Sequence, residues 1–316
     1  RKEWKNIPIL EIVTALPKKL EVIPNRPLPN KVMAWPAYYK TVKYGNENSE
    51  ELKGFGELAQ AVEGQIQSSP LVKVRPEVKS RLDTAQQILD SNPETNNLQL
   101  VIVDGYRQID VQKKLFDAYL TFIREKNKHL NLNEEEILIM ARKMVSEAPT
   151  DLEVLRESPP PHSTGGSTDV ILVDKSKIDI TSDHWLQGAM VEFGAKFDEM
   201  FGDYFHSETF FYERMLVENK RLDKNEQAAL ENRRVLYYVM SEVGFSNYYT
   251  EFWHYDFGNQ FNAQILGKQS AEFGFAGGLA NGKIVEDLSA EQAVYQAYVK
   301  KHGPDVAEKV KHHFGL

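Results

Sequence analysis

Two histidines and two carboxylates in the second half of the chain have the residue types and spacing of a metal-dependent hydrolytic site. His162 and Asp169 lie seven positions apart in "HSTGGSTD", and Glu251 and His254 lie three apart in "EFWH". The chain has no cysteine, so a metal must use imidazole and carboxylate ligands. We predict that His162, Asp169 and His254 bind one zinc ion per chain. Three protein ligands leave a fourth position open for water, as catalytic zinc sites do.

The role of Glu251 follows from the strand expected around His254. In such a strand Phe252, His254 and Asp256 share one face, and aromatic residues fill the other. Glu251 would then fall on the aromatic face, where a carboxylate is costly to bury. We therefore expect a bulge or a loop-to-strand transition that turns Glu251 towards His254. There it can serve as general base for the zinc-activated water.

A folded loop must bring His162 beside Asp169. Gly165 and Gly166 lie between them and exclude a helix that presents both on one face. Asp169 directly precedes the apolar run 170–173, which predicts an acid at the mouth of a buried strand. Taken alone, His162 is typical of a loop residue, Asp169 of a turn cap, and the Glu251–His254 pair of neighbours at a strand edge.

The elements that position these residues are helices mixed with strands. Hydrophobic periodicity and turn residues predict helices at about 76–93, 110–127, 133–149 and 225–243, and from 288 to the end. Apolar β-branched runs predict strands at 98–104 and 168–174, and the aromatic segment 245–258 is strand-like. Residues 1–74 are rich in turn signals and predict an irregular arm. Without regular βαβ alternation, we expect an α+β fold with a mixed, mainly antiparallel sheet and flanking helices around the zinc site.

The composition of the chain argues against some classes of binding partner. The formal net charge is -8 and there is no long basic run, so we expect no nucleic-acid partner. No apolar stretch reaches the length of a membrane span. No signal-peptide pattern is visible, so we expect a cytoplasmic protein; removal of a leader before Arg1 would place it in the periplasm or outside the cell. The oligomeric state has no sequence signal.

Five short motifs occur in an order that resembles a known enzyme family. They are "DGYR" at 104–107, "HSTGGSTD" at 162–169, "FDEM" at 197–200, "NRR" at 232–234 and "EFWHY" at 251–255. Together they resemble the VanX-like D-alanyl-D-alanine dipeptidases of the M15 zinc peptidase family. The resemblance implies an M15 or Hedgehog-like zinc dipeptidase core over residues 76–258. Residues 1–75 would be an N-terminal extension packed on this core, and residues 259–316 a mostly helical C-terminal extension.

The resemblance also implies a reaction. A small peptide of the D-Ala-D-Ala type would be hydrolysed by metal-activated water, with Glu251 as general base and Arg107 stabilising the oxyanion. Asp198 would bind the amino end of the substrate; its simpler alternative is an acid that orders a loop. Arg107 could instead be a structural ion-pair partner of Asp104. Pro160 departs from the serine usual in the family, which bears on substrate selectivity.

Three other activities remain compatible with the residues. A D,D-carboxypeptidase acting on peptidoglycan stem peptides would share all the zinc chemistry. A non-haem iron oxygenase also uses two histidines and one carboxylate, although it usually spaces the first pair more closely and does not need Glu251. A metal-binding module without catalysis is disfavoured by the presence of both Glu251 and Arg107.

Overall fold

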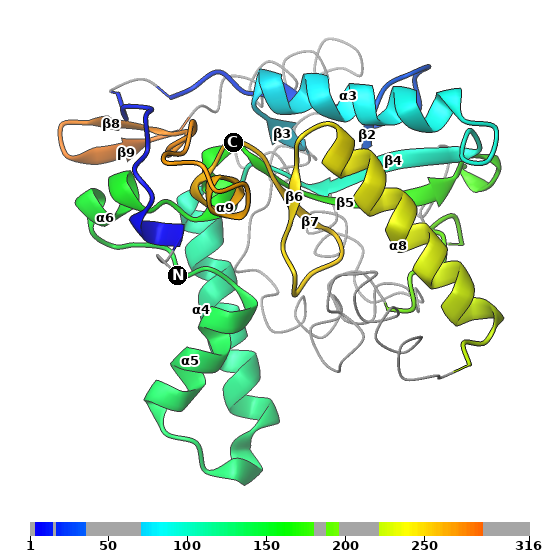
Figure 1. The fold of residues 1–316 in the computed structure, drawn as a ribbon. Coiled ribbons are helices and arrows are strands. Elements are labelled where there is room, and N and C mark those ends of the chain that lie inside the picture. The colour runs from blue at the N-terminus through cyan, green and yellow to red at the C-terminus, as the bar shows by residue number, and fades with distance from the viewer. Residues whose placement is uncertain (1–3, 15–16, 36–70, 180–187, 196–220, 287–316) are drawn as a thin grey trace, which may run out of the picture.

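The computed structural model describes residues 4–14, 17–35, 71–179, 188–195 and 221–286. Its centre is a five-stranded sheet in the order β2-β4-β5-β7-β6 (Figure 1). The strands are β2 (Met33–Ala34), β4 (Leu98–Asp104), β5 (Ser167–Asp174), β7 (His254–Asp256) and β6 (Ser246–Asn247). Only β2 and β4 pair in parallel; the other pairs in this sheet are antiparallel. The predicted mixed, mainly antiparallel sheet is confirmed.

Helices α3 (Pro76–Ser91) and α8 (Lys224–Glu242) cross one face of the sheet and pack against each other (Figure 1). Val78, Leu82, Ala85 and Leu89 of α3 are buried, so the helical period read from the sequence identifies the buried face. Both β4 and β5 are buried over nearly their whole length. The core therefore lies between these two helices and the two long central strands.

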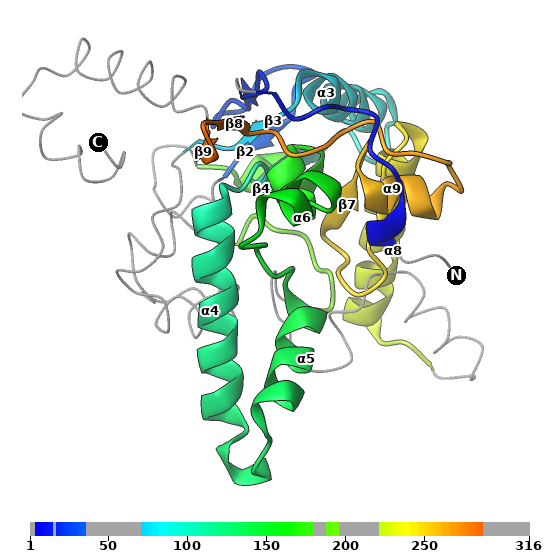
Figure 2. The ribbon, with the colours of Figure 1, turned by 90° about the vertical axis from the view of Figure 1, so that its left-hand side faces the viewer.

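A helical hairpin projects from the other side of the molecule (Figure 2). It consists of α4 (Ile109–Lys126), the 3-10 turn η3 (Lys128–Leu130) and α5 (Glu134–Met144). Asn133 and Glu136 form a capping box that satisfies backbone N–H groups at the start of α5. A small cluster that includes Phe116, Ile123 and Ile137 holds the two helices together. Both helices begin within one residue of the predicted positions, but α5 ends at Met144 and not at the predicted residue 149.

The residues before α3 contribute more regular structure than their turn-rich sequence predicted. β1 (Glu21–Val22) pairs with β3 (Lys73–Val74), and β2 is an edge strand of the central sheet. Strands of two residues are too short to produce an alternating pattern, so the expectation of an irregular arm was wrong at these positions. Earlier still, the 3-10 turn η1 (Trp4–Asn6) lies against α9 (Gln260–Ile265).

The remaining elements are short. They are α6 (Leu152–Glu157), η4 (Pro161–Thr164), η5 (Lys175–Lys177), and the antiparallel pair β8 (Gly278–Ala280) and β9 (Lys283–Val285). The helix expected from residue 288 lies outside the described residues. Within the described part of the chain, no helix is long and apolar enough to cross a membrane.

Candidate metal centre and substrate cavity

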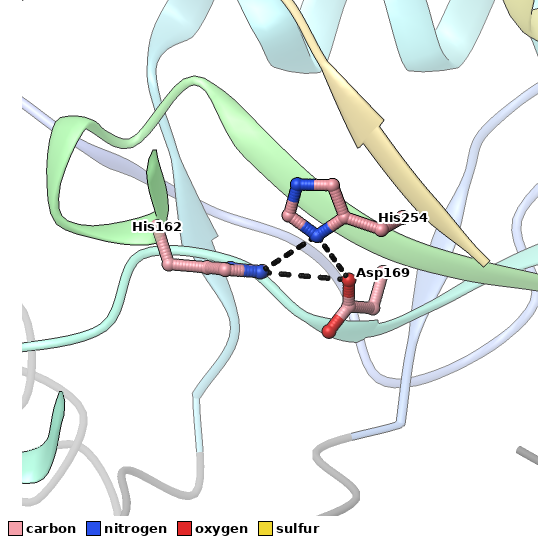
Figure 3. Close-up of side chains that lie close together, drawn as sticks. All are labelled: His162, Asp169 and His254. Carbon is pink, nitrogen blue, oxygen red and sulfur yellow. Dashed lines mark hydrogen bonds and ion pairs between the residues drawn. The ribbon is translucent and has the colours of Figure 1, made fainter. Parts of the chain in front are cut away.

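The structure brings the three predicted zinc ligands together, with their ligand atoms directed at one point (Figure 3). His254 Nδ1 lies 3.0 Å from Asp169 Oδ1 and 3.2 Å from His162 Nε2. His162 Nε2 lies 3.5 Å from Asp169 Oδ1. Ligand atoms placed ~2 Å from a zinc ion at tetrahedral angles are separated by roughly 3.3 Å. All three residues are buried, and the donor set and its spacing fit zinc.

Local backbone structure explains how residues far apart in sequence meet. Asp169 and His254 are direct partners in the register of β5 and β7. His162 lies in the 3-10 turn η4, which ends at Thr164 and is followed by Gly165 with a φ of 70°. A side chain at Gly165 would be strained at that φ and would approach Leu20 to 2.9 Å. The glycine therefore permits the sharp return that the sequence required of this loop.

Each imidazole is oriented by a partner that contacts its other ring nitrogen. His162 Nδ1 lies 2.7 Å from the carbonyl oxygen of Gly105, which can only accept a hydrogen bond, so Nε2 is left unprotonated for a metal. His254 Nε2 lies 3.1 Å from Asp256 Oδ2, which leaves Nδ1 facing the site. Asp256 Oδ1 in turn accepts hydrogen bonds from Ser167 Oγ at 2.6 Å and Asn259 Nδ2 at 2.5 Å. Strand alternation placed Asp256 on the face of His254, but sequence reasoning gave it no role.

Glu251 lies at the edge of the cluster, in the loop between β6 and β7. β7 begins only at His254, so the expected loop-to-strand transition is present. The Glu251 N–H donates to the carbonyl oxygen of Tyr248, and the His254 N–H donates to that of Glu251. This tight turn carries the Glu251 carboxylate to 3.8 Å from His254 Nδ1. The carboxylate is thus beside the ligand cluster and not on the aromatic face.

Burial and the surrounding charges shift the pKa values of these groups. Burial raises the pKa of Glu251 to about 7, with Asp169 acting in the same direction and His254 and Arg107 opposing it. Burial alone would lower the pKa of His254, but the carboxylates of Asp256 and Asp169 raise it well above its usual value. Burial would raise the pKa of Asp169, but the two histidines hold it well below its usual range. The site thus favours anionic Asp169 beside positive charge, which an imidazolium or a metal cation can supply.

Asp104 and Gln112 hold the Arg107 guanidinium in place, and Arg107 lines the same cavity as the ligand cluster. Its Nε donates to Asp104 Oδ2 at 3.1 Å, and its Nη2 forms a shorter contact with the same oxygen. Its Nη1 donates to Gln112 Oε1 at 2.9 Å. The structural ion pair between Arg107 and Asp104 therefore exists, and Arg107 also lines the cavity.

The cavity has a volume of about 180 Å³ and extends from the ligand cluster to three other parts of the chain. One wall comes from α4 and the end of α5, another from the β6–β7 loop, and a third from η1 and α9. The site residues that line it are Arg107, His162, Asp169, Glu251 and His254. The predicted catalytic and metal-binding groups therefore share one cavity of the described structure.

Arg75 ties the loop that carries His162 to segments near both ends of the described chain. Its Nε donates to the carbonyl oxygen of Thr164 at 2.6 Å. Its Nη1 and Nη2 donate to the carboxylate of Glu11 at 2.8 and 2.6 Å, and Nη2 also donates to the carbonyl oxygen of Gly274 at 3.1 Å. Burial would raise the pKa of Glu11, but Arg75 holds it below its usual range. The metal loop is thus supported by residues outside the predicted core.

The motifs "FDEM" and "NRR" differ from the other three, each of which contributes at least one residue to the lining of the cavity. Asp198 and the rest of "FDEM" lie outside the described residues, so the predicted contact with the substrate's amino end stays a prediction. In "NRR", Arg233 Nε donates to the carbonyl oxygen of Phe193 at 2.7 Å, and its guanidinium lies 4.7 Å from the ring centroid of Phe252. Arg233 of this motif therefore packs on the ring of Phe252, the residue after Glu251, and does not line the cavity.

A family model described as peptidase M15, D-ala-D-ala dipeptidase, matches residues 76–273, which is more than half of the chain. The protein belongs to the peptidase M15 family. The match includes every predicted metal ligand as well as Glu251 and Arg107. Membership and the His/Asp/His cluster make this protein a zinc metallopeptidase, with the α+β fold described above.

Three proteins similar to this chain have low sequence identity to it. A D-alanyl-D-alanine dipeptidase from Synechocystis sp. (strain ATCC 27184 / PCC 6803 / Kazusa) is 27% identical over 197 residues, which are 61% of this chain and 71% of the relative. A Zn(II) complex of a variant of the vancomycin resistance D,D-pentapeptidase VanY is 16% identical, with a TM-score of 0.27 over 65% of this chain and 84% of that one. VanYB in complex with D-Alanine-D-Alanine is also 16% identical, with a TM-score of 0.28 over 64% and 82%. The family assignment rests on the sequence match.

Proposed function

We propose that this M15 peptidase hydrolyses free dipeptides of the D-Ala-D-Ala type, with His162, Asp169 and His254 as the zinc ligands. The observation that carries the proposal is the placement of Glu251. Its carboxylate lies 3.8 Å from His254 Nδ1, in the cavity that Arg107 also lines. A base beside the metal site, with a cation in the same cavity, is the arrangement that peptide hydrolysis needs.

The protein groups have separate tasks in this reaction. A zinc ion at the three ligands would lower the pKa of a water molecule and polarise the substrate carbonyl. Glu251 removes a proton from the attacking water and returns it to the leaving amine; burial raises its pKa and so strengthens it as a base. Arg107 donates hydrogen bonds to the oxygen on which negative charge develops. Asp104 and Gln112 fix the guanidinium in advance, which reduces the cost of positioning it during the reaction.

The substrate preference is supported by family membership and by the relative described as a D-alanyl-D-alanine dipeptidase. A dipeptidase must bind a free amine as well as a free carboxylate. We propose that Asp198 binds the amine through a charge-assisted hydrogen bond. The decisive experiment compares D-Ala-D-Ala, its N-acetylated form, L-Ala-L-Ala and a peptidoglycan pentapeptide as substrates of the zinc-loaded protein.

Fastest cleavage of free D-Ala-D-Ala is expected. Faster cleavage of the acetylated dipeptide or the pentapeptide would show that the enzyme is a D,D-carboxypeptidase instead. Equal rates for the D,D and L,L dipeptides would retain the dipeptidase activity and remove its stereochemical preference. Absence of hydrolysis with all four substrates, in protein shown to contain zinc, would refute the proposed function.

A further inference from the structure

The first described residues of the chain form part of the cavity wall. Trp4 and Lys5, both in η1, line the cavity together with Tyr248, Phe261 and the metal ligands. The ring centroids of Trp4 and Phe261 are 5.9 Å apart, and those of Phe261 and Tyr248 are 4.9 Å apart. Tyr248 then lies 5.9 Å from the His254 ring. A continuous row of aromatic rings thus runs from the N-terminal segment to a zinc ligand.

This segment is fixed to the body of the enzyme. Gln260 Nε2, at the start of α9, lies 2.6 Å from the carbonyl oxygen of Ile7 and 3.2 Å from that of Lys5. Ile7 is buried against Ala263 and Ala271. Backbone hydrogen bonds follow, from the Ala271 N–H to Pro8 and from the Leu10 N–H to Ala271. Because side-chain and backbone contacts both hold it, the segment presents Trp4 and Lys5 from a defined position.

Charge distinguishes Lys5 from most other cations of the cavity. Arg107 is paired with Asp104, and Arg142 with Glu147. Among the described residues, only Lys5 and Lys143 are lining cations with no carboxylate at ion-pair distance. Lys5 Nζ lies 5.4 Å from the centroid of the Trp4 ring, so its positive charge lies beside the row of aromatic rings. Lys143 is in the last turn of α5, which forms another wall of the cavity.

We propose that Trp4 and Lys5 form the subsite for the carboxyl end of the dipeptide: Lys5 binds the terminal carboxylate, and Trp4 blocks extension of the peptide beyond it. The proposal rests on the proposed dipeptidase function. An ammonium group repels the substrate's amino end and attracts its carboxylate, which sets the direction of binding. A large ring beside that position leaves no room for a further residue.

Kinetics of two variants test the two parts of the subsite. For Lys5→Gln, kcat/KM for D-Ala-D-Ala should fall about tenfold through KM, because a charge-assisted hydrogen bond is lost. The rate with D-Ala-D-Ala amide, which has no carboxylate, should not change. For Trp4→Ala, cleavage of D-Ala-D-Ala-Gly at the D-Ala-D-Ala bond should rise relative to D-Ala-D-Ala, whereas Trp4→Phe should keep the preference for the dipeptide.

Zinc content and melting temperature are measured on each variant to show that it is folded and loaded. Lys19→Gln is the matched control, because this lysine side chain is 81% exposed and does not line the cavity. Gln260→Ala removes the side-chain hydrogen bonds that hold the segment and changes no lining residue. Like Trp4→Ala, it should raise the rate with D-Ala-D-Ala-Gly relative to D-Ala-D-Ala. If Lys143→Gln removes the preference for the carboxylate and Lys5→Gln does not, the assignment to Lys5 is overturned. If neither Trp4→Ala nor Gln260→Ala changes the rate with D-Ala-D-Ala-Gly relative to D-Ala-D-Ala, the proposal that Trp4 blocks longer peptides is refuted.

A binding measurement separates this proposal from the proposed function. The zinc-loaded Glu251→Gln protein is titrated calorimetrically with D-Ala-D-Ala and with its amide, with and without Lys5→Gln. Tighter binding of the acid than of the amide, abolished by Lys5→Gln, supports the subsite even if the wild-type protein does not turn the dipeptide over. Wild-type hydrolysis combined with no effect of Lys5 on binding refutes the subsite alone.

Discussion

The imidazole of His254 is held between two carboxylates, with Asp169 Oδ1 3.0 Å from Nδ1 and Asp256 Oδ2 3.1 Å from Nε2. Asp256 is itself fixed by Ser167 and Asn259, and all five side chains are buried. A carboxylate behind a metal-ligating histidine sets its tautomer and increases its basicity. Asp256 would therefore influence a zinc ion held by His254 without being a ligand itself.

Replacement of Asp256 should weaken zinc binding. Asp256→Ala is expected to lower zinc affinity about 10–100-fold, because His254 loses the group that orients it. Competition with a chromophoric chelator measures the affinity, and thermal unfolding shows how much of the loss comes from the fold. Asn259→Ala is the matched control, since it leaves the His254–Asp256 contact in place and should have a smaller effect. Wild-type affinity in both Asp256→Ala and Asp256→Asn would show that the orienting role is wrong.

Removal of either ligating histidine should abolish tight zinc binding. His162→Ala and His254→Ala each leave two protein ligands where three surrounded one point. Zinc per chain, measured by elemental analysis after dialysis, is expected to fall from one to near zero. A protein that keeps a full zinc ion after both replacements must bind it elsewhere.

Glu251→Gln should separate metal binding from catalysis. The amide keeps the shape of the side chain but cannot accept the proton, so turnover should drop about 10²–10⁴-fold while zinc content stays at the wild-type level. Both quantities are measured on one preparation. Loss of zinc together with activity would make Glu251 a ligand, and surviving activity would assign the base to another group.

Arg107→Ala should lower kcat about 10²–10³-fold if the guanidinium stabilises the oxyanion. The contact with Asp104 also gives the residue a structural role, so stability is measured in parallel. Asp104→Asn weakens the ion pair but keeps the cation in the cavity, and it should retain much more activity than Arg107→Ala. Equal losses in the two variants, each matched by loss of folded protein, would favour the ion pair as the main role of Arg107.

Zinc affinity should fall as the pH is lowered. The pKa of His254 is raised well above its usual value, so the metal must displace a proton from Nδ1 over a wide pH range. Below this pKa each displaced proton costs about tenfold in affinity per pH unit. Calorimetric titrations in buffers of different ionisation enthalpy should detect the released proton near neutral pH. Affinity that does not vary with pH would contradict the raised pKa.

Much of the fold was predictable because local patterns determine it. The spacing of Val78, Leu82, Ala85 and Leu89 identified the buried face of α3, and the continuous apolar run after Asp169 identified a strand covered on both faces. The ligand set could be predicted from residue type, since the chain offers no cysteine and its two short motifs contain the required imidazoles and carboxylate.

What the sequence did not reveal depends on contacts between distant segments. Asp256 was placed on the correct face by alternation, but its hydrogen bond from Ser167 crosses 89 positions. The pairing of β2 with β4 involves only two residues of each strand, which are too few to show the alternation of apolar and polar residues that identifies a strand. Trp4 and Lys5 reach the cavity because Gln260 binds backbone carbonyl groups, and carbonyl groups carry no sequence signature.

The hydrogen bonds of Arg75 have a consequence for the order of events during folding. Through this side chain the loop of His162 is connected to Glu11, 64 positions before Arg75, and to Gly274, 199 positions after it. Contacts that close such long stretches of chain form late, because the entropy of closing them must be offset by structure already in place. A nascent chain that has not yet reached residue 274 lacks one support of the metal loop. We expect the loop to become rigid only after residue 274 has been synthesised and has folded back onto Arg75, so that uptake of zinc reports that this contact has formed.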